Sequence, residues 1–392
     1  MIDNKKLIVD QGSEVATLLQ SMADDTFWDF AQHQVVPGSV YVFSMKTLGC
    51  HTSYIKELLN SDTIHAVLGN PAEGADTMWW YCHRLDLFDH VRQRKLLLVT
   101  GGLFHNAELP ALLHEHFLVQ MHNYSENKKA ITDYRINNTD QKPFKFLFLN
   151  GRMRVHRHYL LDRFRTNGLL ESSIWTNLDP RVCAGFRYVE WYENEDFAKP
   201  QHGPVLQRLR YPFPVQRLPS KYEVDRYRSR PLLLERDRKI DLHVKHHLFD
   251  WEWGEVYLEP QPYLDTYFSL VTETVFDYPC SFRTEKIWKP VAIGHPWIAV
   301  ANAGYYRDMH NLGFQTFGHL IDETFDHIEQ PQDRCERIAQ IVEDLCQQDL
   351  VAFAKAAKSV CDHNQNLMQE LHITLQQRFI PRFQQFILDN FA

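Results

Sequence analysis

Residues 267–300 read YFSLVTETVFDYPCSFRTEKIWKPVAIGHPWIAV, and this stretch carries the clearest local signals in the chain. Thr284 has a side chain suited to capping a helix N-terminus, which predicts Glu285 and Lys286 in the first helical turn. Free backbone N–H groups and the helix dipole favour an anion such as phosphate there, and Lys286 adds a full charge. Helix capping alone would also explain the triplet. Gly-His-Pro at 294–296 then leads into a predicted strand at 297–301.

Short apolar runs and helical patterns alternate on both sides of this stretch, which predicts an α/β fold. Strands are predicted at 39–45, 95–100 and 144–150, and from Ile174 onward. A glycine turn at Gly101-Gly102, a helical stretch and an apolar run at 117–121 predict a βαβ unit after the second strand. Helices are predicted at about 157–167, with Gly168 as C-cap, at 333–346 and from 350 to the end, and an amphipathic segment at 261–271.

The length of 392 residues exceeds the ~250–300 residues of a typical single core, so two domains are expected. A polar stretch at 125–142 precedes the point where the strand and helix pattern restarts. This predicts an N-terminal domain at 1–141, a second domain at 142–365 and a C-terminal packing helix at 366–392. Prolines interrupt residues 181–262, which we interpret as an irregular insertion in the second domain.

The chain is acidic, with a net charge of −8 and a pI near 6.2, which argues against general nucleic-acid binding. The insertion differs, because Lys and Arg outnumber Asp and Glu between Arg208 and Lys245. This segment is either a solvated insertion or a surface for an anionic partner. No apolar run is long enough for a membrane helix and the start lacks a signal-peptide pattern. We therefore expect a cytoplasmic protein, or one secreted without a classical signal peptide.

Cysteine and histidine spacing gives no prediction of a metal site. The seven cysteines are scattered and lack C-x-x-C spacing, as is typical of reduced core thiols. Histidine clusters at 243–247 and at His114 and His116 are expected by chance in a chain with 21 histidines, and H-E-x-x-H is missing. No Asp-x-Asp occurs either. No metal or cofactor is predicted.

Residues 265–326 resemble the donor-binding region of GT-B glycosyltransferases related to the α-1,3-fucosyltransferases, including uncharacterised bacterial and viral members. The resemblance rests on Glu273-Thr274, on Phe282-Arg283-Thr284-Glu285-Lys286 and on Gly294-His295-Pro296. It continues through GFQTF at 313–317 and DETFD at 322–326. Thr274 stands where the family often has Asn, and Phe282 where Tyr is frequent. The identity of the sugar nucleotide, GDP-fucose or another, therefore stays open.

The resemblance implies two Rossmann-like domains that face each other across a cleft, with a C-terminal helix crossing back. A weaker match at 148–157 is similar to the first strand and loop of the donor domain. The implied donor site comprises Asn150, Arg154, Arg157, Glu273, Thr274, Phe282, Thr284, Glu285 and Lys286. The implied activity is inverting, metal-independent transfer of a sugar from a nucleotide diphosphate to a glycan, lipid or protein acceptor. For Arg154 and Arg157, ordinary ion pairing at a helix start is the alternative.

An inverting transferase needs a base for the acceptor hydroxyl, and the first domain is expected to supply it. His105 and Glu108 are the candidates, because they follow the strand at 95–100 and strand C-terminal ends line such clefts. Either residue could instead be an ordinary loop residue. The alternative for the whole chain is a non-catalytic GT-B-like protein that binds an anionic partner through the basic insertion.

Overall fold

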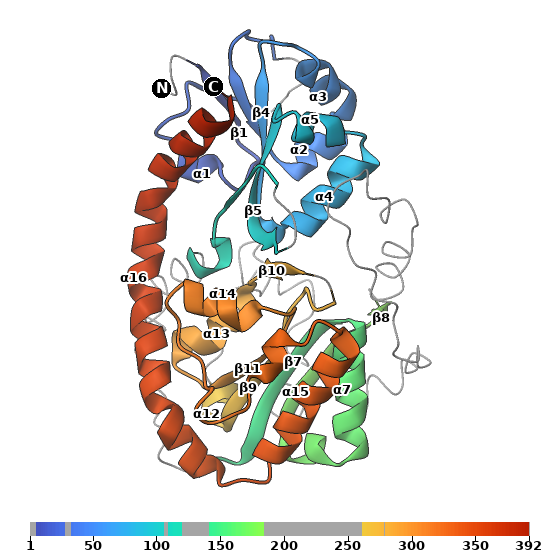
Figure 1. Cartoon of the computed structure of the whole chain (residues 1–392), viewed down its shortest axis with the longest axis vertical. Helices are drawn as coiled ribbons and strands as arrows, with labels where there is room; N and C mark the ends of the chain where they lie inside the picture. Colours follow the sequence, from blue (N-terminus) through green and yellow to red (C-terminus); the bar gives the residue numbers. More distant parts are fainter. Residues whose placement is uncertain are drawn as a thin grey trace, which may run out of the picture.

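Two β-sheets of mainly parallel strands form the framework of the protein in the computed structural model (Figure 1). The structure describes residues 5–27, 33–105, 109–119, 141–183, 261–277 and 279–391. Nearly all of the predicted insertion, most of the polar stretch at 125–142 and Glu108 lie outside these residues. The predicted α/β class with parallel sheets is confirmed.

The first sheet has the order β10-β5-β4-β3-β1-β2, with β6 also paired to β5. Its pairs are parallel except for that of β10 with β5. The strands are β1 (Leu7–Asp10), β2 (Asp25–Phe27), β3 (Val40–Phe43), β4 (His65–Gly74), β5 (Leu96–Phe104), β6 (Ala111–Leu113) and β10 (Cys280–Phe282). The helices between them are α1 (Ala16–Leu19), α2 (Met45–Cys50), α3 (Thr52–Leu59), α4 (Ala75–Arg84) and α5 (Phe88–Arg92).

The second sheet is parallel, with the order β11-β9-β7-β8. Its strands are β7 (Phe144–Met153), β8 (Ile174–Cys183), β9 (Thr266–Thr272) and β11 (Trp297–Val300). The associated helices are α7 (Val155–Thr166), η3 (Leu169–Ser172), α12 (Gln261–Leu264), α13 (Glu285–Ile293), α14 (Tyr305–Asn311), η6 (Thr324–His327), α15 (Pro331–Leu345) and α16 (Leu350–Phe391).

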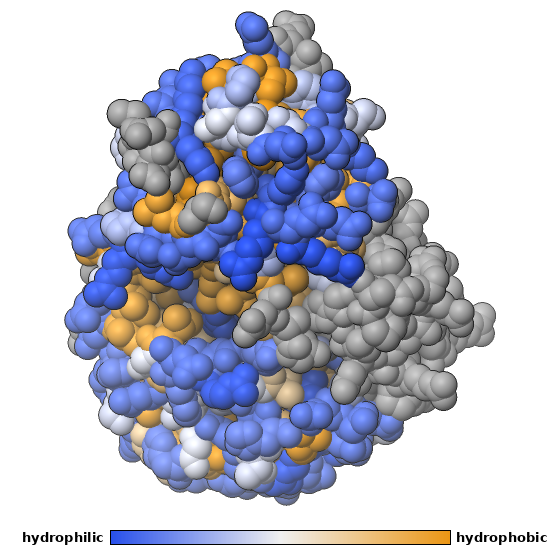
Figure 2. Space-filling model, turned by 45° about the horizontal axis from the view of Figure 1, so that its top comes forward, coloured by the Kyte–Doolittle hydropathy of each residue, from blue (hydrophilic) through white to orange (hydrophobic). Residues whose placement is uncertain are grey.

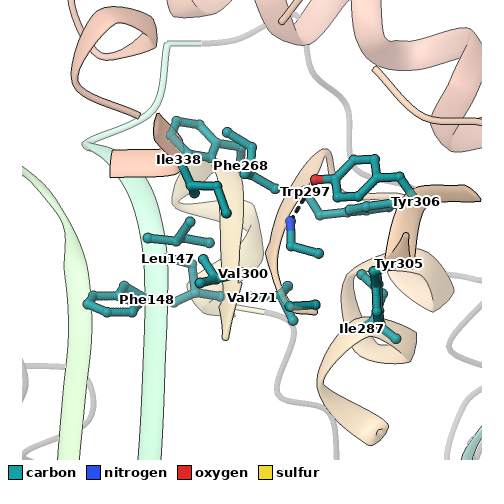
Figure 3. Packing of buried hydrophobic residues seen from close by; sticks show 14 of the residues in the cluster. Leu147, Phe148, Phe268, Val271, Ile287, Trp297, Val300, Tyr305, Tyr306 and Ile338 are labelled. Carbon is teal, nitrogen blue, oxygen red and sulfur yellow. Dashed lines mark hydrogen bonds between the residues drawn. The ribbon is translucent and has the colours of Figure 1, made fainter. Parts of the chain in front are cut away.

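The core of the second sheet explains why its strands are almost continuously apolar. Every residue of β9 is buried, as is usual for a parallel strand covered on both faces. Figure 3 shows side chains of β7, β9 and β11 meeting Ile287, Tyr305 and Ile338 from three helices. Tyr306 also accepts a hydrogen bond from the backbone N–H of Ala299, at 2.8 Å.

Helix α16 runs along both sheets (Figure 1). Its first half packs in the core of the second sheet, whereas Phe379, Phe383 and Ile387 pack with residues of β1 and β3 in the first. The helix is continuous across the predicted boundary at 365–366. Among the described residues, none of the helices could span a membrane. Figure 2 shows hydrophobic surface at mid-height on one face, between more hydrophilic upper and lower parts.

Two local predictions are wrong. The βαβ unit is not formed, because β5 continues through Gly101 and Gly102 and is followed by the short strand β6, while residues 116–119 are helical. A side chain at Gly101 would lie 2.2 Å from the Pro71 carbonyl, and one at Gly102 would lie 2.4 Å from the Ser281 carbonyl. The glycines therefore admit neighbouring backbone instead of making a turn. The segment at 261–271 is a short helix followed by the buried strand β9.

Replacing Gly101 by Ala tests this packing. The new methyl group overlaps the Pro71 backbone, so we expect G101A to lower the free energy of unfolding by about 3 kcal/mol in urea titrations. The control is G49A in α2, where a side chain would meet nothing within 4 Å and the change should stay within about 1 kcal/mol. Equal stability of the two variants would contradict the close approach of the strands at Gly101.

Candidate functional site

The carboxyl ends of β7 and β9 define the edge of the second sheet where a ligand is expected. These strands are neighbours in space, whereas β8 extends the sheet beyond β7 and β11 extends it beyond β9. The strand order therefore reverses between β7 and β9. In open parallel sheets, ligands bind outside the carboxyl ends of the strands at such a reversal.

Buried polar side chains connect the carboxyl ends of β7 and β9, where the strand order reverses. Asn150 of β7 is fully buried and accepts a hydrogen bond from the hydroxyl of Thr272 at 2.9 Å. Arg157 of α7 donates to the backbone carbonyl of Thr272 at 2.7 Å and to that of Glu273 at 3.2 Å. Only 2% of Arg157 is exposed. These contacts fix the end of β9 relative to β7 and α7.

Glu273 is the buried centre of the edge. Its carboxylate accepts hydrogen bonds from the backbone N–H of Thr274 (3.2 Å) and of Thr284 (3.1 Å), from the Thr284 hydroxyl (2.6 Å) and from the Tyr305 hydroxyl (3.1 Å). The carboxylate therefore joins β9 to the first residues of α13 and α14.

The start of α13 matches the predicted cap, but its backbone is not as open as the sequence suggested. Thr284 caps the helix, and Glu285 and Lys286 lie in its first turn. The N–H of Thr284 donates to Glu273, and that of Lys286 donates to the Thr284 hydroxyl at 3.4 Å. The expectation of free N–H groups at these two positions is wrong, because a carboxylate and a hydroxyl of the protein itself satisfy them.

Lys286 carries the accessible positive charge of this helix end. Its ammonium group lies 2.7 Å from Glu285, 3.2 Å from the Thr284 hydroxyl and 3.5 Å from the Thr274 hydroxyl. About 28% of its side chain is exposed. Burial alone would raise the pKa of Glu285, but Lys286 and Lys289 outweigh it and the pKa is lowered.

Two arginine side chains lie close together at the start of α7. Arg154 occupies the N-cap position, is half-buried and lies close enough to Arg157 to affect its ionisation. Burial, and then Arg154, lower the pKa of Arg157 to about 9. Burial and the two arginines likewise lower the pKa of His156 well below its usual range. A buried guanidinium group beside a second, half-buried one favours an anionic ligand at this edge.

Phe282 and His105 lie where the first sheet meets the second half of the chain. We call this region the junction; it comprises β10, the end of β5 and the starts of α13 and α14. Phe282 is buried in β10 and its ring centroid lies 6.1 Å from that of Phe117. His105 follows β5, and its Nε2 lies 2.6 Å from a carboxylate oxygen of Asp308 in α14.

The structure brings together seven of the predicted donor residues: Asn150, Arg157, Glu273, Thr274, Thr284, Glu285 and Lys286. Arg154 is electrostatically coupled to Arg157.

Three charged residues of the junction were missed by sequence reasoning. Arg283 forms a buried ion pair with Glu115, donates to the Ser281 hydroxyl at 2.7 Å and lies 4.0 Å from Asp308. Burial alone would lower the pKa of Arg283, but the charge and hydrogen bond of Glu115 outweigh this effect and the pKa of Arg283 is raised. Glu115 is 168 residues away in the sequence, so no local spacing could have indicated the pair.

The acidic residues at 322–326 support α14. Glu323 accepts hydrogen bonds from the Thr316 hydroxyl and the Phe317 N–H, both at 2.7 Å, and burial raises its pKa to about 7. Asp326 accepts the N–H groups of Tyr306 and Arg307, the first residues of the helix. An open groove of about 540 Å³ lies beside this segment, lined by His310, Phe314, Gln315, Thr316, Gly318, His319, Ser359 and Val360.

The edge of the first sheet also contains a buried carboxylate that the sequence did not indicate. Asp10 ends β1, is 2% exposed, and accepts the N–H groups of Gly12 (2.9 Å) and Ser44 (3.2 Å). The strand order of this sheet reverses between β1, which ends at Asp10, and β3, which Ser44 follows. Its carboxyl edge is therefore built on the same plan as that of the second sheet.

No group of three or more potential metal ligands occurs within the part of the chain that the structure describes. The histidines at 243–247 lie outside that part. Burial lowers the pKa of His114 to about 3 and that of His116 to about 4. Comparison of the chain with family models, with characterised proteins and with solved structures gives no match.

Replacing Glu273 by Ala tests its role at the edge. Removal of the carboxylate deprives three buried donors of Thr284 and Tyr305 of their acceptor, each loss costing roughly 1–3 kcal/mol. We expect E273A to lower the free energy of unfolding by at least about 3 kcal/mol. The control E57A removes an exposed carboxylate from α3 and should change stability by less than about 0.5 kcal/mol. A small effect of E273A would show that the edge does not depend on this carboxylate.

Proposed function

We propose that the chain is a GT-B-type glycosyltransferase that moves a sugar from a nucleotide diphosphate to a glycan, lipid or protein acceptor. The observation that carries the proposal is that both sheets turn their carboxyl edges toward one junction. β10 pairs with the carboxyl end of β5 (Figure 1). Two residues after β10, Thr284 binds Glu273 at the carboxyl end of β9. A donor on one edge can therefore meet an acceptor on the other.

The path of α16 supports the GT-B arrangement. It begins in the core of the second sheet and ends on the first, where Lys5 donates to the carbonyl of Phe391 at 2.7 Å. The resemblance implies a C-terminal helix that crosses back to the first domain, and the path of α16 is consistent with it. Together with two open parallel sheets, it favours acceptor binding on the first sheet and donor binding on the second.

The charges on the second edge suit a leaving nucleoside diphosphate. Bond cleavage at the sugar develops negative charge on the phosphates, so fixed cations there lower the barrier. Lys286 is accessible, and the buried Arg157, which is electrostatically coupled to Arg154 and to Glu285, adds positive charge beneath the same edge. Each charge-assisted contact contributes about 1.5–3 kcal/mol. We therefore propose transfer without a metal, with inversion at the anomeric carbon.

Nucleotide binding provides the first test. In a thermal-shift panel of nucleoside diphosphates and their sugars, we expect at least one to stabilise the parent chain. K286A should bind that nucleotide about 10–100-fold more weakly while keeping its own unfolding temperature, because Lys286 lies at the surface of the edge. K95A, which removes a lysine at the start of β5 on the opposite edge, should bind like the parent.

Transfer or donor hydrolysis should then persist in excess chelator. Loss of activity with chelator and its recovery with manganese would contradict the metal-independent proposal. Binding of no nucleotide, together with tight binding of an anionic partner through residues 208–245, would instead favour the non-catalytic interaction protein.

A further inference from the structure

The contact between His105 and Asp308 joins the carboxyl end of β5 in the first sheet to α14, which follows the second sheet. His105 comes from the end of β5 and Asp308 from α14, and their side chains are 22% and 17% exposed. They are thus accessible from the junction and yet held at 2.6 Å by residues from both halves of the chain.

Asp308 is kept in its ionised form. Burial would raise its pKa, but the hydrogen bonds from His105 and Ser281 and the charge of Arg283 together lower it. Arg283 is fixed in turn by the buried Glu115, and Arg307 lies 3.5 Å from the other oxygen of Asp308. Among the described residues, the charged groups around the imidazole are therefore Asp308, Arg283 and Arg307.

An ionised carboxylate only accepts hydrogen bonds, so it selects the tautomer of His105 that has its proton on Nε2. Nδ1 then carries the lone pair, and it has no hydrogen-bond partner among the residues that the structure describes. The ring also packs on Gly304, where an added Cβ would lie 3.1 Å from Cε1 of His105. The imidazole is thereby oriented with a free basic nitrogen.

This pair is connected to the donor edge through two short segments. Tyr305 and Asp308 are three residues apart in α14 and lie on the same side of it, and Tyr305 binds Glu273. Arg283 directly precedes Thr284, the cap of α13. The groups that fix the imidazole are therefore continuous with those that fix Lys286.

We propose that His105 is the general base of the transfer reaction and that Asp308 is its positioning residue. The inference rests on the proposed function. Nδ1 of His105 takes the proton of the acceptor hydroxyl while the oxygen of that hydroxyl forms a bond to the anomeric carbon of the sugar. The bond from that carbon to the phosphate oxygen breaks, and its electron pair leaves with the nucleoside diphosphate beside Lys286. Asp308 balances the imidazolium until it releases the proton to water.

The test compares H105Q, D308N and D308E in acceptor-dependent transfer. We expect H105Q to lower kcat by about 10²–10⁴-fold with an unchanged nucleotide thermal shift. D308N should lower kcat less than H105Q and leave the KM of the acceptor unchanged, because the imidazole loses the carboxylate that fixes its tautomer and orientation. D308E should recover part of the activity. K95A is the control for full activity.

The outcomes separate the two proposals. If the parent transfers sugar and H105Q keeps its kcat, the base assignment is overturned while the glycosyltransferase stands. If D308N lowers stability but leaves the kcat of the folded fraction unchanged, the positioning role of Asp308 is overturned. If the parent binds and transfers no nucleotide sugar, the proposed function falls and the base assignment falls with it.

Discussion

The carboxylate of Glu273 is the interaction on which the candidate site depends. It is wholly buried and accepts hydrogen bonds from residues that begin two different helices. A buried carboxylate is stable only when such donors surround it, so the ends of β9, α13 and α14 must be fixed together. This arrangement also positions Lys286. The hydroxyl of Thr284 binds Glu273, and the same hydroxyl contacts the ammonium group of Lys286.

A second constraint is the contribution of a strand from the second half of the chain to the first sheet. This strand, β10, pairs with β5, and Arg283, which directly follows β10, forms a buried ion pair with Glu115. Removing one partner of such a pair leaves an uncompensated buried charge, at a cost of about 3–5 kcal/mol. The junction is therefore a specific, polar contact, and it is the same contact that holds Asp308 beside His105.

The sequence predicted what depends on local chemistry. The cap at Thr284, the left-handed Gly168 after α7 and the strands at β3, β7 and β11 all follow from residue type and periodicity. It did not predict that β5 runs on through Gly101, because the same glycine pair suits a turn or a close approach of strands. Glu115, Asp308 and the donors around Glu273 converge only through the fold, so their roles required the three-dimensional arrangement.

We propose that a nucleoside diphosphate binds at the carboxyl edge of the second sheet, opposite that of the first. Photolabelling with an azido nucleoside diphosphate, followed by peptide mass spectrometry, tests this directly. A nucleotide bound at this edge should label residues within 150–157 and 272–286, and both excess unlabelled nucleotide and K286A should reduce the labelling. Label confined to the groove beside His310 and Ser359, or label that excess nucleotide does not reduce, would contradict it.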